Sequence, residues 1–406
     1  MKKFILTIAV VVCLILGIGV MSANAATYTG SCGDNVTYSL NTNNGVLTIN
    51  GEGNMWDYSY KVAVPWDNYT DYIKSVVINK GVTRIGDSAF EDCCNLTSVT
   101  IPDGVRSIGD YAFDSCDSLI QIEMPGSVTK LGSGIFSYCE NLGKVVICDG
   151  VPAVGKSMFF ECSNLVDVSI PNSVKVIENC AFEMCTNLKS ITIPESVIWI
   201  GELAFLECKS LENINIDCNI KSLEVSTFYK CDNLKDVTIP EGVISIEEKA
   251  FRECDKLTSV TIPKSVTKIG NAAFYHCDEL TDVYYCGSES EWAEIDFGIW
   301  GNDELLNAVI HYAEEGENDA IIPDDAGMSP EIGNTTLMFT PKNATEGDII
   351  AVLVVKDGVS TSYAKTYSGS GTVTFEIEKG FNSMKILVWD SYESMEPLME
   401  EYATIE

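Results

Sequence analysis

Histidine, cysteine and acidic side chains are the groups through which this chain could do chemistry. His276 and His311 are its only histidines. Neither stands in the H-E-x-x-H spacing of a zinc protease, and the sequence has no G-x-S-x-G elbow, phosphate loop or dinucleotide fingerprint. Cysteines with the C-x-x-C spacing of a metal site are also missing. The sequence therefore predicts no metal ion, no cofactor and no nucleophilic catalytic centre.

Acidic residues are the one abundant catalytic type, with 59 Asp and Glu against 26 Lys and Arg and a formal net charge of −33. Two carboxylates placed across a sugar chain can hydrolyse it. The acids expected on an open groove are Glu123, Asp167, Asp236 and Asp282. Because water would reach all of them, we expect ordinary pKa values and rank a glycan-processing enzyme last among the possible functions. The charge also argues against nucleic acid and anionic membrane surfaces as partners.

A period of 23 residues organises most of the chain. Phenylalanine recurs at this spacing, cysteine follows each phenylalanine by three residues, and leucine follows each cysteine by three. The phenylalanines are Phe90, Phe113, Phe136, Phe159, Phe182, Phe205, Phe228, Phe251 and Phe274. Nine copies without an insertion predict a solenoid of stacked repeats.

One repeat is enough to predict the elements. Apolar residues alternate with polar ones through Ile122 and Met124, which predicts a short half-buried strand, and Pro125 ends it. A Gly-Ser bend and a short helical turn are predicted over residues 132–136. Stacked copies predict an α/β repeat solenoid with a parallel sheet on the concave face and short helices on the convex face, the strands lying about 4.8 Å apart.

The repeat resembles that of a known family. The pattern A-F-x-x-C-x-x-L-x-x-I-x-I-P-x-x-V-x-x-I-G, as in residues 89–109, is similar to the leucine-rich repeats of the BspA-like class of bacterial surface proteins. The similarity runs from about Val76 to Tyr285. It implies a leucine-rich repeat fold and a role in adhesion or host interaction, and many members of the class have no known ligand.

The repeat cysteines are expected to form a second buried ladder. Stacked cysteines are near enough for disulfides, but their Cβ vectors run parallel, so we predict buried free thiols in preference to a disulfide-stapled array. The remaining cysteines of the mature chain (Cys32, Cys94, Cys148, Cys180, Cys218 and Cys286) follow no repeating register.

The ends of the chain predict further segments. Lys2 and Lys3 precede an apolar run over residues 4–20, and Ala23-Asn24-Ala25 suits signal cleavage after Ala25, with an uncleaved anchor as the alternative. We expect a signal peptide at 1–25, an N-terminal β cap at 26–75, the solenoid of nine repeats at 76–286, a C-terminal cap at 287–312, an acidic linker at 313–330 and a small β-sandwich at 331–406. The caps are predicted to contain a hairpin over residues 36–49, a short helix from residue 287 and a strand over residues 305–312.

Binding is the function that these features favour. The expected concave strands carry small hydroxyl and amide residues, which suit hydrogen bonding to a protein or glycan but equally suit a sheet face that contacts only water. Trp199 takes the register of Ser107 and Lys130 and should be exposed, as an interface residue would be. The candidate binding residues are Gln121, Glu123, Lys144, Val146, Ser169, Thr192, Trp199, Asn213, Asn215 and Thr238.

We therefore expect a secreted or cell-surface protein that binds an extracellular protein or glycan. It would have no membrane-inserted segment after signal cleavage. A structural surface component without a specific ligand is the first alternative, and the glycan-processing enzyme is the second.

Overall fold

The computed structural model describes residues 26–313, except residue 217, and the backbone of seven strands between residues 331 and 403. The chain divides into two compact units, Met1–Tyr312 and Ala313–Glu406. The predicted signal peptide at 1–25 lies outside the described residues, as does the predicted acidic linker at 313–330 after its first residue. Within the described part of the chain, no helix has the length and apolar character needed to cross a bilayer.

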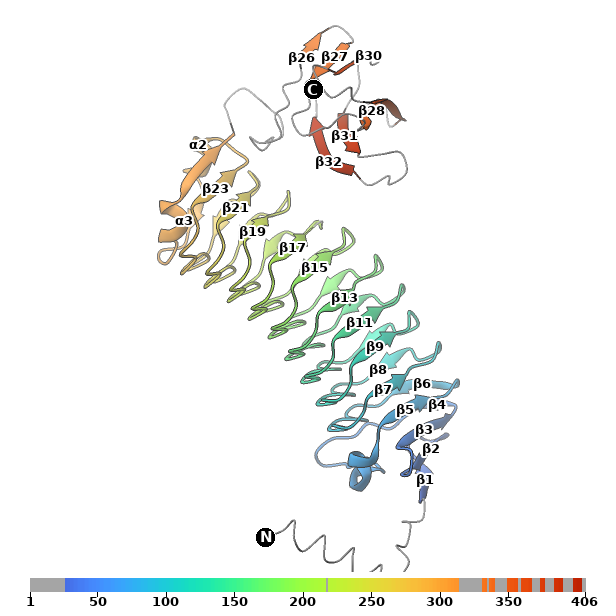
Figure 1. The fold of residues 1–406 in the computed structure, drawn as a ribbon. Coiled ribbons are helices and arrows are strands. Elements are labelled where there is room, and N and C mark those ends of the chain that lie inside the picture. The colour runs from blue at the N-terminus through green and yellow to red at the C-terminus, as the bar shows by residue number, and fades with distance from the viewer. Residues whose placement is uncertain are drawn as a thin grey trace, which may run out of the picture. The chain divides into compact units, whose positions relative to one another are not determined.

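Parallel strands build one long face of the first unit, here called the strand face (Figure 1). Its strands are β5 (Ser75–Ile78), β7 (Ser98–Thr100), β9 (Gln121–Met124), β11 (Lys144–Ile147), β13 (Asp167–Ser169), β15 (Ser190–Ile193), β17 (Asn213–Ile216), β19 (Asp236–Thr238), β21 (Ser259–Ile262), β23 (Asp282–Tyr285) and β25 (Val309–Tyr312). Within β9, Ile122 and Met124 are buried while Gln121 and Glu123 are exposed. Gln121 pairs with Lys144, so the sequence period is also the hydrogen-bonding register. The predicted parallel-sheet solenoid is confirmed.

Each coil adds a second parallel strand after the first, and from β8 onward this second strand has only two residues. These strands are β4 (Gly53–Asn54), β6 (Val82–Ile85), β8 (Ser107–Ile108), β10 (Lys130–Leu131), β12 (Ala153–Val154), β14 (Val176–Ile177), β16 (Trp199–Ile200), β18 (Ser222–Leu223), β20 (Ser245–Ile246), β22 (Lys268–Ile269) and β24 (Asp296–Phe297). Their ladders run β4-β6-β8-β10, β12-β14-β16 and β18-β20-β22-β24. We call this surface the second sheet.

The segments predicted as short convex helices are hydrogen-bonded turns. Two residues of each turn adopt positive φ, as Ser88 (49°) and Asp92 (58°) do in the first repeat. The N–H of Ser88 donates to Asp110 O (2.8 Å) and that of Phe90 to Ala112 O (2.8 Å), both in the next repeat. Because these donors bond between repeats, they cannot bond four residues back along the chain, and no α-helix forms.

A stack of phenylalanine rings fills the core behind these turns. All nine rings are fully buried. Neighbouring ring centroids lie 5.1 to 5.9 Å apart, with planes within 20° of each other. Since no single repeat could bury its own ring on both sides, the stack makes each repeat depend on its neighbours.

The ladder cysteines lie beside the rings as free thiols, as predicted, and all described cysteines are free. From Cys116 onward, each ladder Sγ donates to the carbonyl of the phenylalanine in the preceding repeat, at 3.1 to 3.3 Å. The thiols therefore also supply weak hydrogen bonds that link successive coils.

The N-terminal end is closed by antiparallel strands and a tryptophan. β1 (Thr27–Ser31), β2 (Val36–Asn41) and β3 (Val46–Gly51) pair in order, which confirms the predicted hairpin, and β3 then pairs in parallel with β5. Trp66 precedes the short helix η1 (Asp67–Tyr72) and stacks on Phe90 at 5.6 Å, extending the ring stack. Trp56 of the same cap is 44% exposed.

The C-terminal end has two short helices. Helix α2 (Glu289–Trp292) begins with a capping box between Ser288 and Glu291. Helix α3 (Asp303–Asn307) contains Leu305, which was predicted to start the final strand; that strand, β25, begins only at Val309. The buried Leu305 side chain closes the core from a helix turn.

Within its described residues, the second unit has seven antiparallel strands: β26 (Glu331–Gly333), β27 (Thr336–Phe339), β28 (Ile349–Lys356), β29 (Val359–Thr366), β30 (Val373–Glu376), β31 (Ser383–Trp389) and β32 (Pro397–Ala403). Their orders are β26-β27-β30 and β29-β28-β31-β32. The packing of these two sheets as a sandwich stays a prediction.

Candidate binding surface

Nine of the ten candidate residues lie together on the strand face. They are Gln121 and Glu123 on β9, Lys144 and Val146 on β11, Ser169 on β13, Thr192 on β15, Asn213 and Asn215 on β17, and Thr238 on β19. All are exposed except Val146, which is half-buried. The 23-residue register places equivalent side chains on adjacent strands, so they form a regular grid.

Trp199 belongs to a different surface. It is 37% exposed, which confirms the exposure predicted from its register. However, it lies on β16 of the second sheet, where it pairs with Val176. The apolar neighbours Val176 and Ile198 are half-buried and exposed, respectively. Trp199 therefore does not extend the grid of the strand face.

Among the described strands, the ladder of the strand face is interrupted between β7 and β9, between β13 and β15, and between β17 and β19. The interruption between β13 and β15 is accompanied by a pocket. Within the described residues 166–170 and 189–194, no ladder joins these two strands, although β13 pairs with β11 and β15 with β17. A pocket of about 370 Å³ occupies this place, lined by residues 166–170, 190–192 and 194. Ser169 and Thr192, both candidates from the sequence, lie on its walls. The interruption itself was not predicted.

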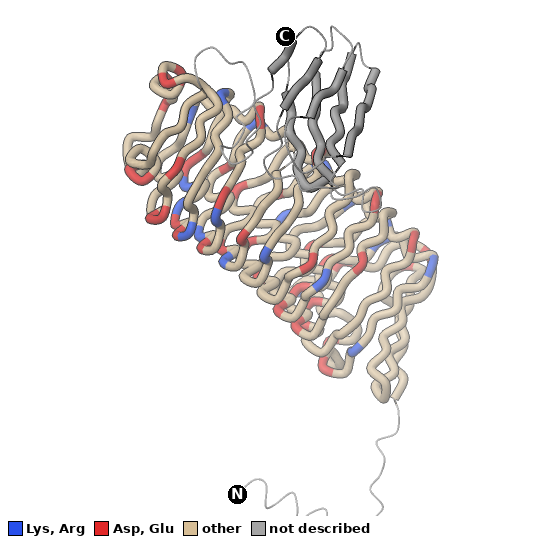
Figure 2. Tube along the Cα trace, turned by 45° about the horizontal axis from the view of Figure 1, so that its top comes forward, with Lys and Arg blue, Asp and Glu red and all other residues tan. Residues whose placement is uncertain are grey.

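Charged groups of the strand face are mostly engaged with neighbours. Lys144 Nζ lies 3.0 Å from Asp167 Oδ2, on the next strand. Cys148 Sγ donates to Glu123 Oε1 at 3.6 Å, and burial together with this carboxylate raises the pKa of the Cys148 thiol. Acidic and basic residues are interspersed along the coils (Figure 2). The strand face therefore offers a mixed polar surface and not a field of one sign.

One histidine–carboxylate pair lies at the C-terminal end of this face. His311 Nε2 is 2.7 Å from Asp282 Oδ1, and its ring stacks on Tyr284 at 4.6 Å. Thr281 Oγ1 donates to the other oxygen of Asp282 at 2.8 Å. The hydrogen bond from His311, and then that from Thr281, lowers the pKa of Asp282, so the expectation of an ordinary value was wrong at this acid. A carboxylate held in its charged form can accept hydrogen bonds but is a poor proton donor.

Comparison with known proteins identifies the repeat. Residues 68–177 and 152–281, together more than half of the chain, match the family model described as BspA type leucine rich repeat region, with six copies. The chain belongs to the BspA-type leucine-rich repeat family. No curated protein sequence matches this BspA-type chain.

Solved structures include similar leucine-rich repeat proteins. A leucine-rich cell surface protein from Faecalibacterium prausnitzii is 27% identical, with 68% of this BspA-type chain and 98% of that chain covered and a TM-score of 0.33. A leucine-rich repeat protein from Eubacterium ventriosum is 23% identical over 73% and 99% of the two chains, with a TM-score of 0.35. The pneumococcal vaccine antigen PcpA is 15% identical over 72% and 89%, with a TM-score of 0.36.

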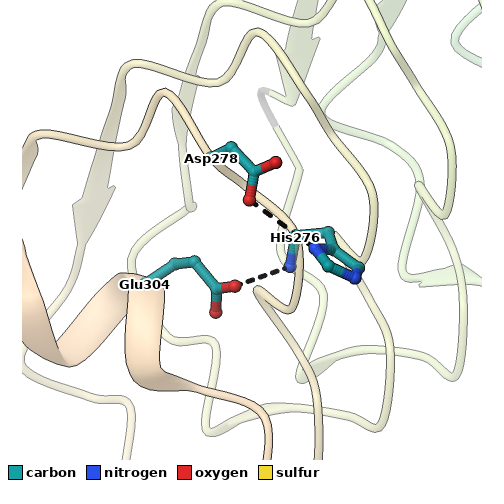
Figure 3. A group of neighbouring side chains, drawn as sticks. All are labelled: His276, Asp278 and Glu304. Carbon is teal, nitrogen blue, oxygen red and sulfur yellow. Dashed lines mark hydrogen bonds and ion pairs between the residues drawn. The ribbon is translucent and has the colours of Figure 1, made fainter.

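Three potential metal ligands gather where the BspA-type repeats meet helix α3 (Figure 3). Ligand atoms of His276, Asp278 and Glu304 all lie within 4.8 Å of one another, a group that the sequence pattern missed because α3 lies outside the 23-residue period. Glu304 Oε1 accepts the backbone N–H of His276 (3.0 Å), and His276 Nδ1 lies 3.6 Å from Asp278 Oδ1. His276 and Asp278 are exposed. These contacts explain the grouping without an ion, so we assign it to the docking of α3 on the last repeat.

The BspA-type strand face is therefore suited to recognition. Its candidate residues supply hydroxyl, amide, ammonium and carboxylate groups at fixed spacing on short, ladder-bound strands. Four acids were considered for hydrolysis from the sequence: Glu123, Asp167, Asp236 and Asp282. They lie on β9, β13, β19 and β23, which are separated by at least one intervening strand of the face. That placement favours contacts with a ligand over paired acid–base chemistry.

Proposed function

We propose that this protein is secreted or held at the cell surface and binds an extracellular protein or glycan through its strand face. The observation that carries the proposal is the grid of exposed polar side chains on consecutive strands from β9 to β19, held over a fully buried ring stack. A solenoid of this kind presents a surface more readily than a closed catalytic pocket. The BspA-type resemblance, which implies adhesion or host interaction, and the predicted signal peptide support the same function and location.

The test begins with capture of a partner. The mature protein is used as bait against extracellular matrix proteins and on a glycan array. Replacing Gln121, Lys144, Asn213 and Asn215 together by alanine should weaken binding of the captured partner by about tenfold or more. Thermal unfolding should change little, because an exposed substitution usually shifts stability by under about 0.5 kcal/mol. A fourfold variant that binds as tightly as the parent protein would show that the strand face is not the binding surface.

The alternative functions give different results in the same experiment. A structural surface component would capture no partner above background. A glycan-processing enzyme would shorten the glycan that it binds, which chromatography of the recovered glycan would reveal.

A further inference from the structure

We propose that the opening between β13 and β15 is a specific binding site for a neutral, hydroxyl-rich sugar unit of a glycan. The inference rests on the proposed binding function of the strand face. It assigns the contact to one place on that face and to one ligand class.

The opening is a local separation of two repeats that remain stacked elsewhere. On the second sheet, β14 and β16 of the same two repeats pair normally. In the core, the Phe159 and Phe182 rings lie 5.5 Å apart. Just before the opening Asn187 N donates to Ser163 O (3.2 Å). Just after it, Ser196 Oγ donates to Val174 O (2.8 Å). Since the repeats are held on all sides, the opening is too confined to admit an additional strand.

The floor of the opening is apolar and accessible. Val168 on β13 and Ile170 just after it pack against the core but are only half-buried. The equivalent residues Val145 and Ile147 on β11 are buried. Pro194 adds a further apolar side to the lining. This aliphatic floor suits the C–H surface of a sugar ring, whose burial is favourable.

The walls carry backbone groups without a ladder partner. Residues of a parallel strand bond alternately to the two neighbouring strands. Asp167 N donates to Gly143 O, just before β11, and Asn213 N donates to Lys189 O, just before β15. By this alternation, the peptide groups of Val168, Ser190 and Thr192 face the opening. Unpaired N–H and C=O groups at an exposed strand edge are available to form hydrogen bonds with a ligand.

Size and charge favour a neutral sugar as the occupant. A volume of about 370 Å³ lies at the lower end of small-ligand pockets, which are roughly 300–1,000 Å³. Sugar hydroxyls both donate and accept, so they match walls that offer peptide N–H and C=O groups together with the hydroxyls of Ser169, Ser190 and Thr192. Among the described residues, no Lys or Arg lines the opening, its one acid, Asp167, is already paired with Lys144, and the net charge of −33 repels acidic sugars.

The test uses the full-length mature protein and a panel of neutral trisaccharides (cellotriose, mannotriose, maltotriose and chitotriose), with sialyllactose as the acidic probe. Affinities are measured by isothermal titration calorimetry. Thr192→Trp places a bulky side chain at the opening. Thr261→Trp is the matched control, because Thr261 holds the same repeat position on β21, which is paired with both β19 and β23. A second matched pair, Asp167→Asn and Asp236→Asn, removes one carboxylate from each position without adding bulk.

We expect at least one neutral trisaccharide to bind, with an affinity lowered about tenfold or more by Thr192→Trp and changed less than about twofold by Thr261→Trp. Asp167→Asn should alter the affinity more than Asp236→Asn does. Equal effects of the two tryptophan variants, tighter binding of sialyllactose, or no trisaccharide binding at all would overturn the proposal. If no sugar binds but the protein captures a protein partner that the fourfold strand-face variant loses, this inference fails while the proposed function stands. If that variant loses nothing, the proposed function fails as well.

Discussion

At the scale of single residues, the phenylalanine rings determine how the repeats hold together. Each central ring is fully buried and stacks on a ring from both neighbouring repeats, as Phe182 does on Phe159 and Phe205. The ladder thiols contribute less to stability, because each fills little apolar volume and donates only one weak hydrogen bond.

Replacing Phe182 by alanine should cost about 3–5 kcal/mol of stability, since it removes a large buried side chain and leaves a cavity. Because repeats contact only their neighbours, the loss of amide protection should concentrate in the coils containing Phe159 and Phe205. Hydrogen exchange with mass spectrometry measures this distribution. Phe182→Leu is the control and should cost clearly less. Uniform loss of protection from Trp66 to Tyr285 would contradict the nearest-neighbour picture.

At the scale of elements, the convex turns depend on unusual backbone conformations. Positive φ recurs in them at non-glycine residues such as Lys249 (59°) and Glu253 (57°). This conformation is costly for residues with a Cβ. The N–H of Lys249 donates to Asn271 O (3.1 Å) and that of Glu253 to Tyr275 O (2.8 Å) in the next coil. Bonding between coils thus stabilises a conformation that the local sequence does not favour.

Lys249→Gly should therefore leave stability unchanged or raise it by up to about 1 kcal/mol, because glycine reaches positive φ without a Cβ clash. Glu248→Gly is the matched control, because Glu248 forms an ion pair with Lys249 and both variants remove that ion pair. Glu248 has no positive φ, so its replacement by glycine should cost about 0.5–1 kcal/mol. Urea denaturation of the two variants compares them directly. Lys249→Gly being the less stable of the two would refute this view of the turns.

At the scale of the whole molecule, the buried thiols link stability to alkaline pH. Burial raises the thiol pKa of seven ladder cysteines well above the usual value of 9.0, namely Cys93, Cys116, Cys162, Cys185, Cys208, Cys231 and Cys254. In the unfolded chain the same thiols ionise near their usual pKa. Their contribution to stability is therefore complete below about pH 8.5 and is lost progressively as the pH rises beyond that.

We expect the urea midpoint, measured under reductant without oxygen, to fall steeply above about pH 9. Each thiol that stays protonated only in the folded state lowers the free energy of unfolding by about 1.4 kcal/mol per pH unit in this range. Cys208→Ala removes one such group and should make the decline shallower by about that amount. An equally steep decline in Cys208→Ala would show that other groups cause it.

The sequence by itself determined the repeat, its register and its buried rows. Residues such as Phe182 and Cys185 stand at positions that repeat every 23 residues. Strands of successive repeats pair with partners 23 residues apart, as Ser190 does with Asn213. The repeat therefore specifies both the stacking of the coils and the exposed positions of the strand face. Trp199 was likewise predictably exposed, but which sheet carries it depends on where the coil turns after Pro194.

Only the tertiary structure decided the departures from this repetition. The opening between β13 and β15 arises because two nearly equivalent coils separate on one face while staying bonded on the other, which reflects the sum of many small packing differences. The residues of the pairs His311–Asp282 and His276–Glu304 are 29 and 28 positions apart, not 23, because the C-terminal cap that follows the last repeat contains short helices and has a longer turn of chain than a repeat. The positive φ turns likewise depend on bonds to the next coil, a partner that no single repeat contains.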